Sequence, residues 1–349
     1  MQFSNQSAKA GVPQRFPRLT QARAPLTCEV VAVNEFGEST LVSIPAERAL
    51  TVYVDKRELV TLMTLGAHPE LLVLGFLRNQ RLIQSAQDIE SITVDWEVGA
   101  AAVKTRHGIA DIEAKTAKRV VTTGCGQGSV FGNLMADVDR IELPAATLAQ
   151  SQLYGIVNAI RLKESTYKSA GSVHACALFQ REELLMFVED VGRHNAIDTI
   201  AGWMWMQEVA PTFGTDVSSL PPEGADFPRG GPSENLTPTL LASRSALPPE
   251  GADFPRGGPS ENCDGMTSAD KIFYTTGRLT SEMVIKSAQM GVPIVVSRSG
   301  ITQMGQSVAQ SLGLCAIGRA TNKHFLCYSG AERLILQPEQ APARPLVRS

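Results

Sequence analysis

Strand-like and helix-like segments alternate through the second half of this chain, and this alternation restricts the possible folds more than any other feature. The apolar patterns predict strands at 173–179, 184–188, 271–275, 293–297 and 314–317, and helices at 148–163, 195–206, 281–290 and 303–312. Such alternation is typical of a layered sheet that carries helices on both faces. The sequence therefore predicts an α/β fold, a three-layer sandwich, for residues 116–335.

A smaller α+β subdomain is predicted for residues 26–115. Its short strands are expected at 41–45, 50–54, 59–63, 92–94 and 102–104. Between the third and fourth strands, His68-Pro69-Glu70 opens a helix whose following residues are almost continuously apolar, so we expect it to be buried on most sides. Residues 1–25 are predicted to be a disordered tail, and residues 336–349 a second tail.

A low-complexity insert is predicted at 211–266, within the sandwich domain. The segment 220–235 recurs without change at 247–262, and each copy carries four prolines and three glycines. A segment with so little apolar content cannot offset its ordering entropy by burial. We expect a loosely ordered surface loop; the alternative is a proline-rich docking segment.

Charge and composition narrow the possible partners. The net charge of −3 gives no reason to expect binding to nucleic acid or to a membrane. No apolar run approaches the roughly 18 residues that span a bilayer, and residues 1–23 lack the apolar stretch of a secretory signal. The cysteines are scattered and form no C-x-x-C, which fits reduced thiols in a cytoplasmic protein: Cys28, Cys125, Cys176, Cys263, Cys315 and Cys327.

Cys125 is the candidate reactive thiol. It follows a predicted strand at 119–123, and glycines at 124, 126 and 128 surround it. A thiol on such a flexible loop with little side-chain bulk is accessible to a large partner. The alternative, a partly buried packing cysteine, remains open from the local sequence alone.

Four further stretches lie at predicted strand ends: 169–174, 189–195, 275–283 and 318–324. In open α/β sheets, ligands bind outside the carboxyl ends of strands, where helix N-termini attract phosphate. Gly-Arg pairs recur in three of these stretches, at 192–193, 277–278 and 318–319, and Lys323 adds a further charge. An anionic, phosphorylated ligand is therefore predicted.

Each of these residues also has a structural interpretation. Asp190 and Asn195 are candidate caps of the following helix, and so are Thr280 and Ser281. His194 is equally compatible with a buried structural histidine.

Several common sites are absent from the sequence. There is no P-loop, no G-x-G-x-x-G that opens a helix early in a βαβ unit, no G-x-S-x-G, and no Cys/His cluster with metal-ligand spacing. The zinc-deaminase pair of H-x-E and P-C-x-x-C is missing too. A lone thiol beside anion-binding loops indicates thiol chemistry on a phosphorylated cofactor, with no metal ligands predicted.

Four blocks resemble the FdhD/NarQ family of formate dehydrogenase accessory proteins: TTGCG (122–126), VHACAL (173–178), EDVGRHNAID (189–198) and TGRLTSEM (276–283). The resemblance runs from about residue 26 to 330, apart from the insert. It implies a larger domain similar to the cytidine deaminase fold without its zinc site, and a homodimer.

The resemblance also implies a sulfurtransferase. A cysteine desulfurase would pass sulfur to Cys125 as a persulfide, and the protein would transfer it to the molybdenum cofactor in its bis(molybdopterin guanine dinucleotide) form. That cofactor is then inserted into the catalytic subunit of formate dehydrogenase. Family members often carry a second cysteine where this chain has Gly128, so a C-x-x-C disulfide step is in doubt here.

The family's cofactor-binding loop corresponds to residues Arg319, Ala320, Thr321, Asn322, Lys323 and His324. The strand-end analysis adds five candidate cofactor-binding residues: His174, Arg193, His194, Gly277 and Arg278. Two alternatives remain. One is a chaperone that delivers the cofactor without moving sulfur, and the other is a thiol–disulfide oxidoreductase that would need Cys176 or Cys315 near Cys125.

Overall fold

The computed structural model describes residues 16–110, 112, 120–121, 128–129, 138–163, 165–208 and 270–342. These residues belong to one compact unit, which comprises 1–210 and 267–349. The insert predicted at 211–266 lies outside the described residues, as does Cys125. The boundary between residues 115 and 116 stays a prediction.

A five-stranded sheet is built from the first part of the chain, in the order β1-β6-β7-β4-β5. Its strands are β1 (Arg18–Leu19), β4 (Arg48–Val54), β5 (Arg57–Thr64), β6 (Ile89–Asp95) and β7 (Ala100–Thr105). Because side chains alternate along a strand, Leu50, Val52 and Val54 of β4 all face the core. Helix α1 (Pro69–Asn79) covers this core, which confirms the predicted α+β subdomain.

Part of the segment 16–25 joins this sheet, since Arg18–Leu19 form β1. β1 pairs in parallel with β6, with Leu19 opposite Ile92. The Thr20 hydroxyl donates to the Glu70 carboxylate at 2.7 Å, and Phe16 packs against the core. The prediction of a disordered tail through residue 25 is therefore wrong for this stretch, because tertiary contacts anchor a segment whose composition is polar.

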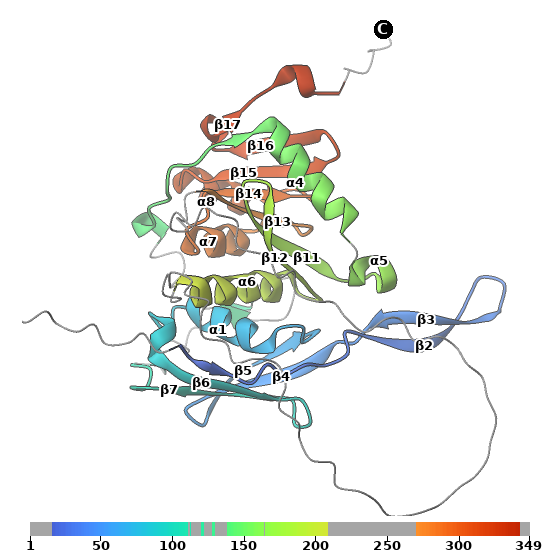
Figure 1. Cartoon of the computed structure of the whole chain (residues 1–349), viewed down its shortest axis with the longest axis vertical. Helices are drawn as coiled ribbons and strands as arrows, with labels where there is room; N and C mark the ends of the chain where they lie inside the picture. Colours follow the sequence, from blue (N-terminus) through green and yellow to red (C-terminus); the bar gives the residue numbers. More distant parts are fainter. Residues whose placement is uncertain are drawn as a thin grey trace, which may run out of the picture. The chain divides into compact units, whose positions relative to one another are not determined.

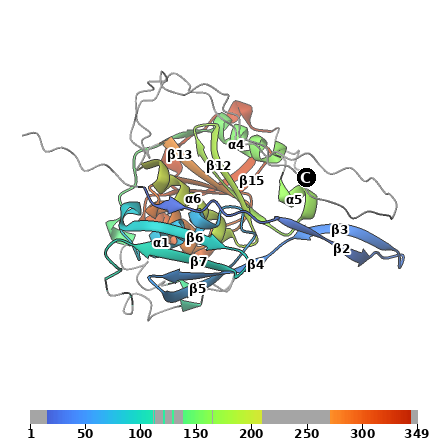
Figure 2. The ribbon, with the colours of Figure 1, turned by 60° about the horizontal axis from the view of Figure 1, so that its bottom comes forward.

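Strands β2 (Thr27–Val33) and β3 (Ser39–Pro45) form an antiparallel ribbon, a sheet of their own among the described strands. The ribbon leaves the five-stranded sheet near β4 (Figures 1 and 2). The sequence predicted β3 but not β2.

The second sheet has six strands in the order β12-β11-β13-β14-β15-β16. They are β11 (His174–Gln180), β12 (Glu183–Asp190), β13 (Lys271–Thr275), β14 (Ile294–Ser297), β15 (Cys315–Thr321) and β16 (His324–Ser329). β13, β14 and β15 are parallel, and β11 is antiparallel to both β12 and β13. The carboxyl ends of β12, β13, β14 and β15 therefore meet at one edge.

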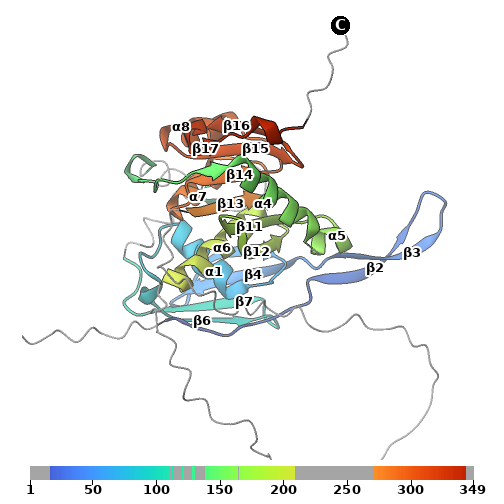
Figure 3. The same ribbon diagram turned by 45° about the horizontal axis from the view of Figure 1, so that its top comes forward.

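Helices cover both faces of this sheet, and the predicted three-layer α/β sandwich is confirmed. On one face lie α6 (Arg193–Glu208), α7 (Ser281–Gln289) and α8 (Gln303–Ser311), packed on residues such as Phe273. On the other lies α4 (Gln150–Leu162), whose core includes the next residue of β13, Tyr274. Figure 3 shows α4 crossing the sheet opposite α6 and α7.

Helices α1 and α6 lie side by side with very close backbones (Figures 1 and 3). A Cβ added at Gly75 would lie 1.6 Å from the carbonyl oxygen of Asp198, and one added at Gly202 would lie 2.0 Å from that of Leu71. The Asn79 amide also donates to the Asp198 carboxylate at 2.7 Å. These contacts join the α+β part of the chain to the sandwich.

The end of the sandwich differs from the prediction. Residues 314–317 were expected to form the final strand, but β15 continues to Thr321 and β16 pairs antiparallel beside it. The shorter elements are β10 (Leu148–Ala149), which pairs with β17 (Leu334–Ile335), helix α5 (Thr166–Ala170), and 3₁₀ turns at Ala86–Asp88, Val138–Arg140, Ala331–Arg333 and Pro338–Gln340. Within the described part of the chain, every helix is too short or too polar to cross a bilayer.

Candidate functional site

The four predicted stretches lie along one edge of the six-stranded sheet. His174 at the start of β11 pairs with Asp190 at the end of β12. Beyond β13, the Thr276 hydroxyl accepts from the Ala175 amide at 3.0 Å, and beyond β15 the Arg319 amide donates to the Ser299 carbonyl at 2.6 Å. Residues far apart in sequence are thereby brought into one row, as the strand-end argument predicted.

His174, Arg193 and Arg278 lie near one another at this edge. Burial lowers the pKa of His174, and the charges of Arg193 and Arg278 lower it further. Gly277 makes this arrangement possible, because a Cβ there would lie only 2.8 Å from Cδ of Arg193. Burial and the two arginine charges thus both disfavour the protonated form of His174.

Arg193 carries a donor that the fold leaves unused. Its side chain is only 3% exposed, and no described residue accepts a hydrogen bond from its Nε. Arg193 is also the first residue of α6, whose free backbone N–H groups attract anions. A buried guanidinium at a helix N-terminus suits a phosphate or another oxyanion.

Asp190 and Asn195 connect segments of the chain. The Asp190 carboxylate accepts from the Thr64 hydroxyl, from the Leu65 amide at 3.1 Å and from the Asn195 side-chain amide at 2.8 Å. Asn195 also donates to the Met63 carbonyl at 2.6 Å. Burial raises the pKa of Asp190, although these hydrogen bonds oppose it. The predicted capping roles are therefore replaced by a clamp between the end of β5 and the start of α6.

His194 lies in a buried polar cluster between helices. Its Nε2 is 3.5 Å from the Glu282 carboxylate, and Lys286 Nζ lies 2.9 Å from Asp198 and 3.4 Å from Glu282. Burial lowers the pKa of His194 to about 3, so the imidazole is neutral and its contact with Glu282 is no ion pair at neutral pH. This position favours the structural interpretation of His194. The Thr280 hydroxyl does not cap α7, although Thr280 precedes the helix.

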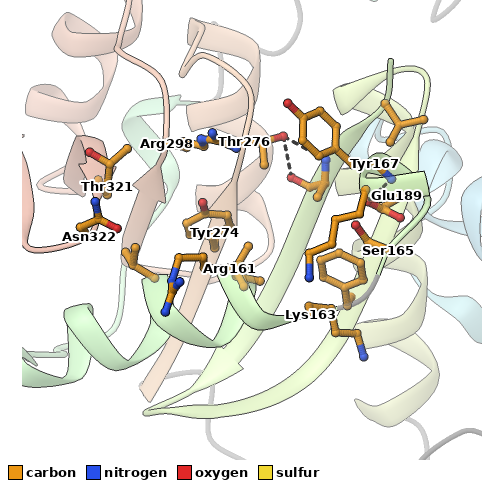
Figure 4. Close-up of a pocket in the computed structure, with 17 residues that line it drawn as sticks. Arg161, Lys163, Ser165, Tyr167, Glu189, Tyr274, Thr276, Arg298, Thr321 and Asn322 are labelled. Atoms are coloured by element: carbon orange, nitrogen blue, oxygen red, sulfur yellow. Dashed lines mark hydrogen bonds between the residues drawn. The ribbon is translucent and has the colours of Figure 1, made fainter. Parts of the chain in front are cut away.

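A cavity of about 290 Å³ opens at the same edge, on the face covered by α4. Figure 4 shows its side chains, with Thr321 and Asn322 at one end and Ser165, Tyr167 and Glu189 at the other. Its polar lining comprises Arg161, Lys163, Ser165, Tyr167, Lys168, Glu189, Tyr274, Thr276, Arg298, Thr321 and Asn322.

Positive charge dominates this cavity. Among the described residues that line it, Arg161, Lys163, Lys168 and Arg298 are cationic and Glu189 is the single carboxylate. That carboxylate already accepts hydrogen bonds from two backbone amides at the start of α5, at 2.6 and 3.2 Å. The cavity is therefore suited to an anionic ligand.

Sequence reasoning missed the cations of this cavity. A signal for Arg298 was present, because it directly follows β14 as other arginines follow neighbouring strands. Arg161 and Lys163 gave no such signal, since they lie on and after α4 and become neighbours of the sheet edge only through packing.

The predicted loop 319–324 is a β-hairpin. β15 and β16 pair with Thr321 opposite His324, and Asn322 and Lys323 form the turn. Arg319 has a φ of 53°, at an irregularity of β15. Ala320, Thr321 and Asn322 line the cavity, whereas Arg319, Lys323 and His324 do not. The expectation of a loop after the last strand is therefore wrong, because a further strand continues the sheet.

Two short paired strands flank position 125 in the sequence. β8 (Val120–Val121) and β9 (Gly128–Ser129) are antiparallel, with Val121 opposite Gly128. The strand predicted at 119–123 is thus confirmed for residues 120–121. The thiol and the rest of 122–127 lie outside the described residues.

The two other thiols considered for the oxidoreductase interpretation, Cys176 and Cys315, are both buried in the second sheet. Cys176 is fully buried in β11, and burial raises its pKa to about 12. Its thiol lies 3.4 Å from the Thr275 hydroxyl. Cys315 is buried too, and a hydrogen bond with Cys327 together with burial raises its pKa. Burial keeps Cys176 as a thiol, which disfavours it as the partner thiol of the oxidoreductase interpretation.

Comparison with known proteins agrees with this fold. The chain is 27% identical over 295 residues to the sulfur carrier protein FdhD of Bacillus subtilis, covering 82% of this chain and 88% of that protein. It is 25% identical over 296 residues to the protein of the same name from Listeria monocytogenes serotype 4b, covering 84% and 91%.

A solved structure shares the fold. The crystal structure of "a putative formate dehydrogenase accessory protein" from Desulfotalea psychrophila superposes with a TM-score of 0.59 at 19% identity, covering 89% of this chain and all of that one. The model of the FdhD/NarQ family matches residues 45–219 and 262–335. The chain therefore belongs to the FdhD/NarQ family.

Proposed function

We propose that this protein is a sulfur carrier that acts for formate dehydrogenase, with Cys125 carrying the sulfur as a persulfide. The relatives named as sulfur carriers support the role. The observation that carries the proposal is the cationic sheet edge, where a 290 Å³ cavity lies on one face of the sheet and Arg193, whose Nε has no acceptor among the described residues, lies on the other. A carrier needs both a thiol and a place to hold an anionic acceptor.

Sulfur is acquired by thiol exchange. The Cys125 thiolate attacks the outer sulfur of a persulfide on a cysteine desulfurase. A new S–S bond forms as the old one breaks, and the desulfurase cysteine leaves as a thiolate. No second thiol is required, which agrees with glycine at position 128.

The acceptor is the molybdenum cofactor in its bis(molybdopterin guanine dinucleotide) form. The outer sulfur passes on as a neutral atom, the metal centre is oxidised by two electrons, and Cys125 returns to the thiolate. Each dinucleotide carries a pyrophosphate, which arginine recognises by paired hydrogen bonds. Arg161 and Arg298 would hold phosphate in the cavity, and Arg193 and Arg278 on the opposite face.

The protein would act in the reducing cytoplasm. The chain would also associate with a second copy of itself. The loaded cofactor would pass to the catalytic subunit of formate dehydrogenase, after which the carrier is free to be reloaded.

Mass spectrometry tests the sulfur step. After incubation with a cysteine desulfurase and cysteine, the peptide that contains Cys125 should gain about 32 Da, the mass of one sulfur atom, and dithiothreitol should remove it. Cys125→Ala should abolish the gain, whereas the matched variant Cys28→Ala, at an exposed cysteine, should keep it. Equal loading of Cys125→Ala and wild type would sink the proposal.

A cofactor chaperone that moves no sulfur is the second candidate. Gly128 favours it, since a paired cysteine is missing. In that case the chain would bind guanosine diphosphate, a fragment of the cofactor, while Cys125 stays unmodified by the desulfurase.

A further inference from the structure

Two cysteines lie on neighbouring strands at one edge of the six-stranded sheet. Cys315 is the first residue of β15, and Cys327 lies in the middle of the antiparallel strand β16. Cys327 pairs with Ile317, and the register is irregular beside this pair. Because side chains alternate along a strand, Cys315 and Ile317 point to the same face. Cys315 and Cys327 are therefore diagonal neighbours on the face that α4 covers.

The two thiols are in contact. Cys315 is fully buried in the core beneath α4, and Cys327 packs against that core while it stays partly exposed. The side chains of the two cysteines are joined by a hydrogen bond, and the sulfur of Cys327 also lies 3.1 Å from the Ser329 carbonyl oxygen. A disulfide joins cysteines whose Cβ atoms are about 3.5–4.5 Å apart, a separation that thiols in such contact approach. Closure also requires little of the sheet, because β16 pairs with β15 alone among the described strands.

The two thiols differ in reactivity. The hydrogen bond from Cys315 lowers the pKa of Cys327 to about 7, whereas that bond and burial raise the pKa of Cys315. At neutral pH a large share of Cys327 is therefore the nucleophilic thiolate, and it is also the thiol that solvent reaches. Cys327 is suited to attack an external sulfur, and Cys315 is placed to attack Cys327 afterwards.

We propose that Cys315 and Cys327 form a redox site, a dithiol that a low-molecular-weight disulfide such as oxidised glutathione converts to a disulfide between β15 and β16. The Cys327 thiolate attacks one sulfur of oxidised glutathione, whose S–S bond breaks as one glutathione thiolate leaves. Cys315 then loses its proton to solvent and attacks the sulfur of Cys327, and the second glutathione leaves as a thiolate. Two protein thiols are thus oxidised by two electrons in total, and one glutathione disulfide is reduced to two thiols, which take up the released protons.

The disulfide would fix one wall of the candidate cavity. The hairpin of β15 and β16 contributes Ala320, Thr321 and Asn322 to the lining. A disulfide at the end of the hairpin away from its turn limits the separation of the two strands. Oxidation of the dithiol should therefore stabilise this wall of the cationic cavity. The site requires neither Cys125 nor sulfur transfer.

Peptide mass spectrometry on the full chain tests the site, without desulfurase or cofactor. After incubation with oxidised glutathione, free thiols are blocked with N-ethylmaleimide and the chain is digested with trypsin, which cleaves after Arg319 and Lys323 and so separates the two cysteines. The peptide of Cys315 should be linked to that of Cys327 in most molecules, and dithiothreitol should release both. The exposed Cys28 should instead form a mixed disulfide with glutathione, which shows that the oxidant is active.

Three variants separate the two steps and the two proposals. Cys315→Ala should stop at the mixed disulfide on Cys327, whereas Cys327→Ala should leave Cys315 an unmodified thiol, because Cys315 is buried. Cys125→Ala should form the disulfide as wild type does, so this proposal and the proposed function can fail independently. Circular dichroism should show each variant folded.

Hydrogen exchange measures the effect on the cavity wall. Backbone amides of residues 324–333 should exchange at least about threefold more slowly in the oxidised chain, because a disulfide restricts local opening. Those of α7 should exchange equally in both states. Wild-type chains in which Cys315 and Cys327 stay free thiols while Cys28 carries glutathione overturn the proposal. Equal exchange of 324–333 in the two states overturns the stabilisation of the wall.

Discussion

Arg193 shows how one residue connects packing with ligand binding. It is the first residue of α6, it is almost fully buried, and its Nε has no acceptor among the described residues. A buried, unsatisfied donor has a free-energy cost of about 1–3 kcal/mol unless a ligand supplies the acceptor. The absence of a side chain at Gly277 leaves room for Arg193. The structure thus maintains a charged donor at the place where an anion would bind.

Gly277→Ala should weaken nucleotide binding. The new Cβ would lie 2.8 Å from Cδ of Arg193, so the guanidinium must move. Isothermal titration with guanosine diphosphate should show an affinity at least about tenfold lower, the loss of one charge-assisted hydrogen bond. Gly300→Ala is the control, because nothing lies within 4 Å of a Cβ there. Equal affinities in both variants would contradict a phosphate role for Arg193.

His194 should make the stability of the protein depend on pH. Burial lowers its pKa to about 3 in the fold, against about 6.5 for the imidazole in the unfolded chain. Between these values the unfolded chain binds more protons, so stability is highest above pH 6.5 and is lost as pH falls toward 3. From pH 7 to 5, protonation of this one group in the unfolded chain should lower the free energy of unfolding by about 2 kcal/mol.

Urea unfolding at pH 7 and pH 5 measures this effect. His194→Gln removes the titrating group, so the variant should lose about 2 kcal/mol less than wild type over this interval. If wild type and His194→Gln lose the same free energy of unfolding between pH 7 and pH 5, His194 is protonated in the fold.

At the scale of elements, helix α6 joins the two halves of the described structure. Its first turn holds Arg193 and Asn195 at the sheet edge, and its middle packs against α1 through Gly202. Asp198, on its buried side, contacts both Asn79 of α1 and Lys286 of α7. One helix therefore fixes the α+β part of the chain, the sandwich and the site relative to one another.

Gly202→Ala should destabilise the fold by about 3 kcal/mol or more, since a Cβ would lie 2.0 Å from a backbone oxygen that cannot move independently of α1. Gly155→Ala in α4 is the control. Its Cβ would meet only the flexible side chain of Glu182, at 2.5 Å, and alanine favours the helix, so this variant should be neutral or slightly stabilising. Chemical unfolding compares the two. An unchanged midpoint for Gly202→Ala would refute the close packing of α1 and α6.

At the scale of the whole molecule, the described cysteines differ in burial: the hydrophobic cores bury some of them, whereas one is exposed to solvent. Cys176 and Cys315 lie in adjoining cores on opposite faces of the six-stranded sheet, whereas Cys28 is exposed on the ribbon. Reactivity should follow this burial, because only an accessible thiolate reacts.

Alkylation by iodoacetamide should therefore modify Cys28 in native buffer and Cys176 only at urea concentrations that unfold the chain. Peptide mass spectrometry of each cysteine measures this. Native-state modification of Cys176 at the rate of Cys28 would mean that the second sheet opens locally.

Much of the fold was predictable, because the spacing of apolar residues and the secondary-structure propensities are properties of short, contiguous segments. The strand predicted at Lys271–Thr275 matches β13 residue for residue, and the helix predicted at 281–290 differs from α7 by one residue. The prediction failed where non-local pairing decided the outcome. β1 is two residues long and exists through its partner β6, and β16 extends a sheet whose last strand had been placed at 314–317.

The sequence by itself determined the alternation that makes this an α/β sandwich, the family, and the row of polar strand ends. These follow from side-chain periodicity and from motifs contained within single segments. Only the tertiary structure decided that His194 is a buried neutral group, that Asp190 clamps β5 to α6, and that Arg161 and Arg298 share a cavity. The physical reason is that burial, pKa and cavity shape depend on neighbours contributed by distant parts of the chain.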